Sequence, residues 1–195
     1  MHSKFSSVLL SGVIMMATSV VAQSPAARQA TAYPLDVTLT YNATQSNAVT
    51  SNSFWMQGGS VQVHGTFYRG LGVVADIAGM HTANIRTSGV SMDMVTSTFG
   101  PRYTWHPAHS RYALFGQALG GEANAFNTVF PASTGALASA SSLAMQLGGG
   151  MNISLSPRIA LRAIEANWVR TQLPNSTTNV QNNLRIGAGI VVRIR

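Results

Sequence analysis

Apolar and polar residues alternate along most of this chain with a period of two. From residue 184 to residue 194 every even position is apolar, whereas the odd positions are mostly Arg or Gly. Because successive side chains of a β-strand point to opposite faces, this alternation predicts a strand with one apolar face. The pattern predicts eight strands in all, at residues 35–43, 60–67, 71–79, 92–105, 112–124, 142–155, 159–173 and 182–195.

Two of these stretches are open to another interpretation. Residues 112–124 carry apolar side chains at both parities, so their two faces are not distinguished by the pattern. Residues 159–173 are rich in Ala, Leu, Arg and Glu, which also favour an amphipathic helix. The strand is preferred there because the length matches the neighbouring strands and because Trp168 and Val169 favour extended structure.

The connections between the predicted strands alternate in length. Short turns are expected at residues 68–70, 106–111 and 156–158. Longer polar links, rich in Asn, Ser, Thr and Gly, are expected at residues 43–53, 81–90, 125–140 and 174–183. This order predicts an up-and-down arrangement, with four long loops at one end and three tight turns at the other.

The low charge favours a barrel whose apolar face points outward. Only 9% of the residues are charged, against about 25% in a typical soluble domain, while 46% are apolar. The polar strand faces hold mostly Thr, Ser, Gln, Asn and Gly, which suit a narrow lumen better than a solvated surface. The sequence therefore predicts an all-β fold, an eight-stranded antiparallel up-and-down transmembrane β-barrel. The alternative is a soluble exported barrel of the lipocalin kind that binds an apolar ligand inside.

Strand length and aromatic placement point the same way. Several predicted strands reach the about 9–11 residues that a tilted membrane strand needs. Aromatic residues near the strand ends are typical of interfacial girdles. These residues are Tyr41, Phe67, Tyr68, Tyr103, Trp105, Tyr112 and Trp168.

The amino-terminal segment has the features of an export signal. Lys4 provides a basic start, an apolar stretch with small residues follows, and Ala22 ends a small-residue cleavage site. We therefore expect a signal peptide at residues 1–22, a flexible leader at residues 23–32 and the barrel at residues 33–195. A retained membrane anchor is the alternative for the first segment.

The chain resembles the small eight-stranded outer-membrane barrels of the OmpA/OmpX type. The resemblance covers roughly residues 33–195 and is carried by the alternating strands, the FGPRYTW stretch at residues 99–105 and the terminal strand. It implies residence in the bacterial outer membrane, contact with outer-membrane lipid and insertion by the barrel-assembly machinery. It also implies an assembly signal in the last strand, where Gly189, Val192 and Ile194 fit the spacing; the usual terminal aromatic is absent and Arg195 ends the chain.

Five charged residues are expected to face the lumen. They are Asp36, Asp76, Arg102, Glu165 and Arg185. Because buried charges must be paired, we predict an interior network of carboxylates and arginines with a structural role. Such a network would exclude a wide pore.

Few other features indicate chemistry. The net charge of +7 comes from twelve scattered basic residues, which does not favour nucleic acid. The chain has no cysteine, and neither a GxSxG motif nor a Ser–His–acid arrangement is evident. His106 and His109 share one predicted turn but lack a nearby carboxylate, so a metal site is not expected. The sequence thus predicts a non-enzymatic barrel without cofactor or metal, a rigid anchor whose loops serve envelope integrity, adhesion or binding of an extracellular partner; a lipid-modifying enzyme is the less favoured alternative.

Overall fold

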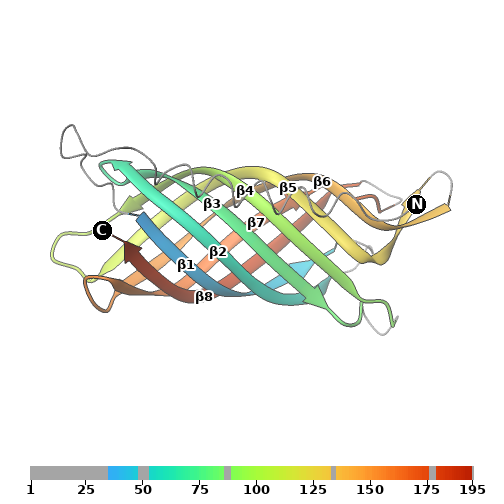
Figure 1. Ribbon diagram of the computed structural model, residues 1–195, viewed down its shortest axis with the longest axis horizontal. Helices are drawn as coiled ribbons and strands as arrows, with labels where there is room; N and C mark the ends of the chain where they lie inside the picture. The colour runs from blue at the N-terminus through green and yellow to red at the C-terminus, as the bar shows by residue number, and fades with distance from the viewer. Residues whose placement is uncertain (1–34, 48–52, 86–88, 133–134, 176–178, 195) are drawn as a thin grey trace, which may run out of the picture. The chain divides into compact units, whose positions relative to one another are not determined.

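The described part of the chain forms one closed, antiparallel β-barrel (Figure 1). The computed structural model describes residues 35–47, 53–85, 89–132, 135–175 and 179–194. The strands are β1 (Leu35–Ser46), β2 (Phe54–Tyr68), β3 (Leu71–Thr82), β4 (Met92–Trp105), β5 (Tyr112–Ala132), β6 (Gly135–Ser154), β7 (Ile159–Thr171) and β8 (Gln181–Ile194). Each strand pairs with its sequence neighbours and β8 closes on β1, so the predicted eight-stranded up-and-down topology is confirmed. The predicted signal peptide and leader lie outside the described residues.

The stagger of the strands makes the barrel narrow. Paired residues can be followed once around the wall from Leu71 on β3 until the path returns to β3 at His81, ten positions further along that strand. A stagger of this size tilts eight strands strongly against the barrel axis and leaves an interior that side chains can fill.

The two ends of the barrel differ in their connections. The three short turns, the start of β1 and the end of β8 lie at one end of the barrel, which we name the turn end. The longer links lie at the other end, which we name the loop end. The turn between β2 and β3 contains Arg69 with φ 40° and Gly70 with φ 88°. Two consecutive residues with positive φ characterise a type I′ hairpin, which suits the twist of the two strands.

One link differs from the sequence-based expectation. Residues 125–140 were expected to form a long loop, but β5 continues to Ala132 and β6 begins at Gly135, so most of this segment is a β-ribbon. The pairing of the ribbon is shifted between Phe126 and Phe130, and Asn127 has a φ of 59°. A bulge of this kind lets the ladder resume beyond an extra residue, which the turn-rich composition of the segment did not reveal.

The wall of the barrel is apolar outside and largely polar inside. Large apolar side chains are exposed on every strand, among them Leu39, Val73, Phe99 and Leu147. Their immediate neighbours in the strands point inward, and many of these are buried polar residues. The helix considered for residues 159–173 is a strand, β7. No helix in the described residues is long and apolar enough to cross a membrane.

Candidate functional site

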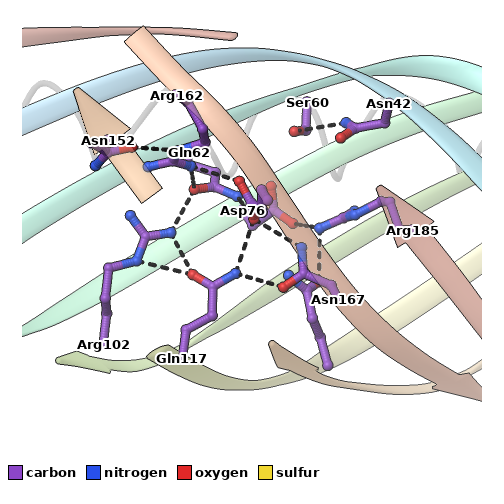
Figure 2. A network of polar contacts seen from close by, with 12 residues as sticks. Asn42, Ser60, Gln62, Asp76, Arg102, Gln117, Asn152, Arg162, Asn167 and Arg185 are labelled. Atoms are coloured by element: carbon purple, nitrogen blue, oxygen red, sulfur yellow. Dashed lines mark hydrogen bonds and ion pairs between the residues drawn. The ribbon is translucent and has the colours of Figure 1, made fainter. Parts of the chain in front are cut away.

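The middle of the lumen is crossed by a network of charged and amide side chains (Figure 2). Of the five charged residues expected there, four are buried inside the barrel, each with at most 3% of its surface exposed: Asp76, Arg102, Glu165 and Arg185. Asp36 is only half-buried at the turn end, and its Oδ2 lies 3.7 Å from Nδ1 of the inward-facing His64. Asp36 therefore pairs with a histidine rather than with one of the predicted arginines.

Glu165 on β7 is the acceptor on which most of the network converges. Its Oε1 accepts hydrogen bonds from the amide nitrogens of Gln62 at 2.8 Å, Gln117 at 3.1 Å and Asn167 at 2.8 Å. Its Oε2 accepts a hydrogen bond from Nη1 of Arg162 at 2.7 Å. A buried carboxylate with four donors is well solvated by the protein itself, which offsets the cost of removing it from water.

Arg102 on β4 reaches the same cluster through amide oxygens. Its Nε donates to Oε1 of Gln117 at 2.9 Å, and its Nη2 donates to Oε1 of Gln62 at 2.5 Å. The guanidinium groups of Arg102 and Arg162 also lie over the ring of Phe115, at 4.5 Å and 4.6 Å from its centroid. Two cations thus share one aromatic ring and one glutamine oxygen, while a single carboxylate, Glu165, lies at the centre.

The wall makes room for this aromatic ring at a glycine. A Cβ placed on Gly150 would come within 2.8 Å of Cζ of Phe115, closer than real Cβ contacts. The absence of a side chain at Gly150 therefore allows Phe115 to pack closely against the wall of the narrow barrel.

Arg162 is the central residue that the sequence pattern missed. Glu165 was expected to face the lumen, and strict alternation from Glu165 would place Arg162 on the opposite, outward face. The structure has a bulge in β7: Arg162 pairs with Gly189 of β8 and Glu165 pairs with Gly187, so one extra residue lies between them. The extra residue reverses the parity of the strand, and both charged side chains therefore face the lumen. The run of apolar residues on both sides of Arg162 was the only available signal.

A second charged pair lies beside the first. Nη2 of Arg185 on β8 donates to Oδ2 of Asp76 on β3 and, at 2.9 Å, to Oε1 of Gln146 on β6. This pair joins strands on opposite sides of the barrel. Together the two groups connect every strand except β1 across the lumen, so the interior is spanned by side chains from wall to wall.

The loop end of the lumen has a different filling. A cluster of buried apolar side chains occupies part of it, whereas the alternation pattern predicted polar residues throughout the lumen. The members are Phe54, Met56, Met80, Ile85, Met92, Met94, Ala125, Phe130 and Leu173. The lumen is thus filled by the polar network in its middle and by an apolar cluster at the loop end. Beside this cluster, Thr171 and Gln181 and also Ser46 and Asn183 make buried hydrogen bonds.

The described residues offer little for catalysis or metal binding. No group of three or more His, Cys, Asp or Glu side chains suited to a metal ion occurs within them. His106 and His109 lie in the turn between β4 and β5 and are exposed. The closest approach to a catalytic pair is on the outer wall, where Nδ1 of His81 lies 2.7 Å from Oδ1 of Asp93. No serine or threonine hydroxyl of the described residues is hydrogen-bonded to His81, as a serine or threonine nucleophile activated by this histidine would be.

The residues of the predicted assembly signal all belong to β8. Val192 and Ile194 are exposed on the outer wall, whereas Gly189 faces inward. A Cβ on Gly189 would lie 1.9 Å from the backbone oxygen of Leu39, so this position requires glycine for the closing contact between β8 and β1. The role of the three residues in assembly stays a prediction.

Comparison with known proteins identifies the fold by structure alone. No family model matches the sequence, and no curated protein matches it. The structure of Neisserial surface protein A (NspA) superimposes with a TM-score of 0.63 at 12% sequence identity, covering 82% of this chain and 97% of NspA. Ail, the attachment invasion locus protein of Yersinia pestis, matches with a TM-score of 0.50 at 16% identity, covering 82% of this chain and 98% of Ail. The chain therefore has the fold of the small eight-stranded outer-membrane barrels that its sequence resembles.

Proposed function

We propose that this protein is a non-enzymatic barrel of the bacterial outer membrane, which anchors four surface links above the lipid. The observation that carries the proposal is the inverted wall: large apolar side chains such as Leu39, Leu147 and Ile190 are more than half exposed, while Glu165 and Arg162 are buried inside. Burial of apolar surface drives folding in water, so such a wall is stable only in an apolar surrounding. A lipocalin-like barrel would need the opposite arrangement, with charges outside and an apolar cavity within.

The filled lumen supports an anchoring role rather than solute transport. The network around Glu165 spans the interior, and the apolar cluster around Met92 and Phe130 fills the loop end. An eight-stranded barrel is just wide enough for side chains to fill it. We therefore expect no open pore through the resting protein.

The links at the loop end are where a partner would bind. They are built mainly of Asn, Ser, Thr and Ala, and in residues 47–53, 83–91 and 172–180 the only charged residue is Arg86. Ail has been crystallised with the heparin analogue sucrose octasulfate, a polyanion. The low charge of the present links instead favours a neutral partner recognised by hydrogen bonds, in adhesion or envelope integrity. Insertion by the barrel-assembly machinery through Gly189, Val192 and Ile194 belongs to the same proposal.

Cell fractionation tests this function directly. The protein is expected in the outer-membrane fraction, extractable only with detergent, and its electrophoretic mobility is expected to change on heating. An epitope inserted between β5 and β6, at residues 133–134, should be accessible on intact cells, whereas one inserted at Pro157, in the β6–β7 turn, should be accessible only after permeabilisation. Recovery of the protein from the soluble periplasm without detergent would overturn the proposal.

A further inference from the structure

The outer wall is not uniformly apolar at the loop end. Gln57 on β2, His81 on β3 and Asp93 on β4 are consecutive register partners, so they form a straight row across three strands. Their strand neighbours Met56, Met80 and Met94 are buried in the lumen, which means that the three polar side chains point outward. We name these three residues the polar row.

Hydrogen bonds hold the polar row in place. The hydroxyl of Tyr41 donates to Oε1 of Gln57 at 2.6 Å, and Nδ1 of His81 lies 2.7 Å from Oδ1 of Asp93. The amide of Asn127 donates to Oδ2 of Asp93 at 2.5 Å. The side chain of His81 is nevertheless 58% exposed. The row is therefore ordered but still open to a ligand on its outer side.

A shallow groove runs down the wall from this row. Its larger part, about 710 Å³, is bordered by the apolar side chains of Leu39, Val61 and Ile77 and by Tyr41. Three glycines, Gly58, Gly59 and Gly79, also line it. A smaller hollow of about 200 Å³ shares Gly58 and Gly79 with it and is bordered by all three residues of the polar row. The two hollows form one path from an apolar wall to a polar end.

Gly79 leaves this groove open, although neither the backbone nor the packing at this position requires glycine. A Cβ on Gly79 would meet no atom within 4 Å, and its φ is not in the positive range. Its register partner Gly59 also points outward without a side chain. On the opposite wall, the corresponding row of register partners consists of the large side chains Leu147, Trp168 and Leu184. A second hollow of about 330 Å³, bordered by Leu71, Tyr103 and Leu147, lies nearer the turn end and does not reach the polar row.

We propose that this groove binds one lipid of the outer leaflet, with an acyl chain along Leu39, Val61 and Ile77 and a saccharide headgroup on the polar row. The inference rests on the proposed function, because it requires the wall to face lipid and the loop end to face outward. An acyl chain fits an apolar groove in a membrane-facing wall, where it replaces other lipid chains at little cost.

The chemistry of the polar row selects the headgroup. Oε1 of Gln57 is engaged by Tyr41, which leaves the amide nitrogen to donate, while the carboxylate of Asp93 and the ring of His81 retain acceptor capacity. Sugar hydroxyls both donate and accept, so they match this mixture. A phosphate only accepts and would meet the negative charge of Asp93, and an ammonium group only donates.

Lipid retention by the refolded barrel, consisting of residues 23–195, tests the proposal. The barrel is incubated in detergent micelles with lipopolysaccharide, phosphatidylglycerol or phosphatidylethanolamine, and bound lipid is counted by native mass spectrometry. Gly79→Leu fills the groove and is expected to lower lipopolysaccharide retention by a factor of about ten or more, which corresponds to about 1.4 kcal/mol of binding free energy. Gly120→Leu is the matched control, because Gly120 is also exposed on the outer wall, a Cβ there meets no atom within 4 Å, and it lies outside the groove.

A second pair of variants tests the headgroup assignment. Gln57→Ala and His81→Ala should each lower lipopolysaccharide retention by a factor of about two to ten, the contribution of one hydrogen bond, and leave phospholipid retention unchanged. Equal retention by the wild type, Gly79→Leu and Gly120→Leu would overturn the site. Stronger retention of either phospholipid than of lipopolysaccharide, lost in the same variants, would overturn the saccharide assignment. Failure of the proposed function would be distinct, since the wild-type protein would then show no heat-modifiable mobility and would stay soluble without detergent.

Discussion

The polar network in the middle of the lumen and the apolar cluster at its loop end fill the barrel by opposite means. In the middle, Glu165 accepts four hydrogen bonds and two arginines lie over Phe115. At the loop end, Phe54, Met92 and Phe130 pack with other apolar side chains and contribute no polar contacts to one another. Both regions fill the same narrow lumen. The stability of the network depends on the position of each hydrogen-bonding partner, whereas that of the cluster depends on how well its side chains fill the space.

This difference predicts unequal tolerance to change. A buried ion pair that loses one partner leaves an uncompensated charge, whereas an apolar core that loses a side chain leaves a gap into which neighbours can partly relax. The methionines at the loop end are unbranched and flexible, so they adapt easily to such a gap. Substitutions in the two regions should therefore differ most where a charge is reversed and least where volume is kept.

Reversal of Arg102 should have the largest effect. Arg102→Glu would place a second carboxylate beside Glu165, leave the side-chain oxygen of Gln117 without its donor and leave that of Gln62 with Arg162 alone. The cost should exceed the about 3–5 kcal/mol that follows removal of one partner from a buried pair. Refolding into detergent should yield no heat-modifiable species, whereas Arg111→Glu at the exposed turn end should refold like the wild type. A normally folding Arg102→Glu barrel would show that the network does not stabilise the fold.

Removal of one member of the Arg162–Glu165 ion pair should destabilise the barrel less than reversal of Arg102, and removal of both members should destabilise it less still. Glu165→Met leaves Arg162 buried without its carboxylate and should lower the free energy of unfolding by about 3–5 kcal/mol. Adding Arg162→Met should restore much of this loss, because two apolar side chains replace the pair. Urea unfolding in lipid vesicles, followed by tryptophan fluorescence, gives the coupling energy of this double-mutant cycle. Additive losses would mean that the two side chains act independently.

A truncation at the loop end should have a smaller effect. Met92→Ala removes a fully buried side chain and should cost about 2–3 kcal/mol, the lower part of the range for such truncations, because the other methionines can close on the gap. Met145→Ala, at an outward position that is 53% exposed, provides the matched comparison and should cost less. The same urea measurement separates the two. A larger loss at Met92 than at Glu165 would reverse the comparison between the regions.

The sequence predicted the wall of the barrel better than its interior. Strict alternation, as in residues 184–194, indicates directly which side chains face outward, because the outer faces of all strands share the same apolar character. Arg162 escaped prediction because the bulge in β7 changes parity by one residue, and the apolar residues on both sides of Arg162 do not locate that bulge. Asp36 faces His64 rather than an arginine because partners across a lumen depend on the stagger of all eight strands. The apolar cluster was missed because methionines such as Met80 and Met94 lie in the polar parity, and only closure of the barrel brings them together.

The smallest predicted effect concerns the region between the network and the apolar cluster. Several buried threonine hydroxyls of β1 and β4, among them Oγ1 of Thr98, have no hydrogen-bond partner among the residues that the structure describes. Buried polar groups are normally satisfied, so an ordered water is the expected partner.

Thr98→Val keeps the shape of the side chain and removes only the hydroxyl, which makes the sign of the stability change informative. If a water bridges the hydroxyl, the substitution should lower the free energy of unfolding by about 0.5–1.5 kcal/mol, the net contribution of one hydrogen bond. If the site is dry, removal of an unsatisfied hydroxyl should stabilise the barrel by a similar amount. Ser97→Ala, at the neighbouring outward position, should change the stability little and serves as the control. A destabilised Thr98→Val barrel would place polar, hydrated contacts up to the edge of the apolar cluster, whereas a stabilised one would extend the dry, volume-dependent part of the lumen down to the network.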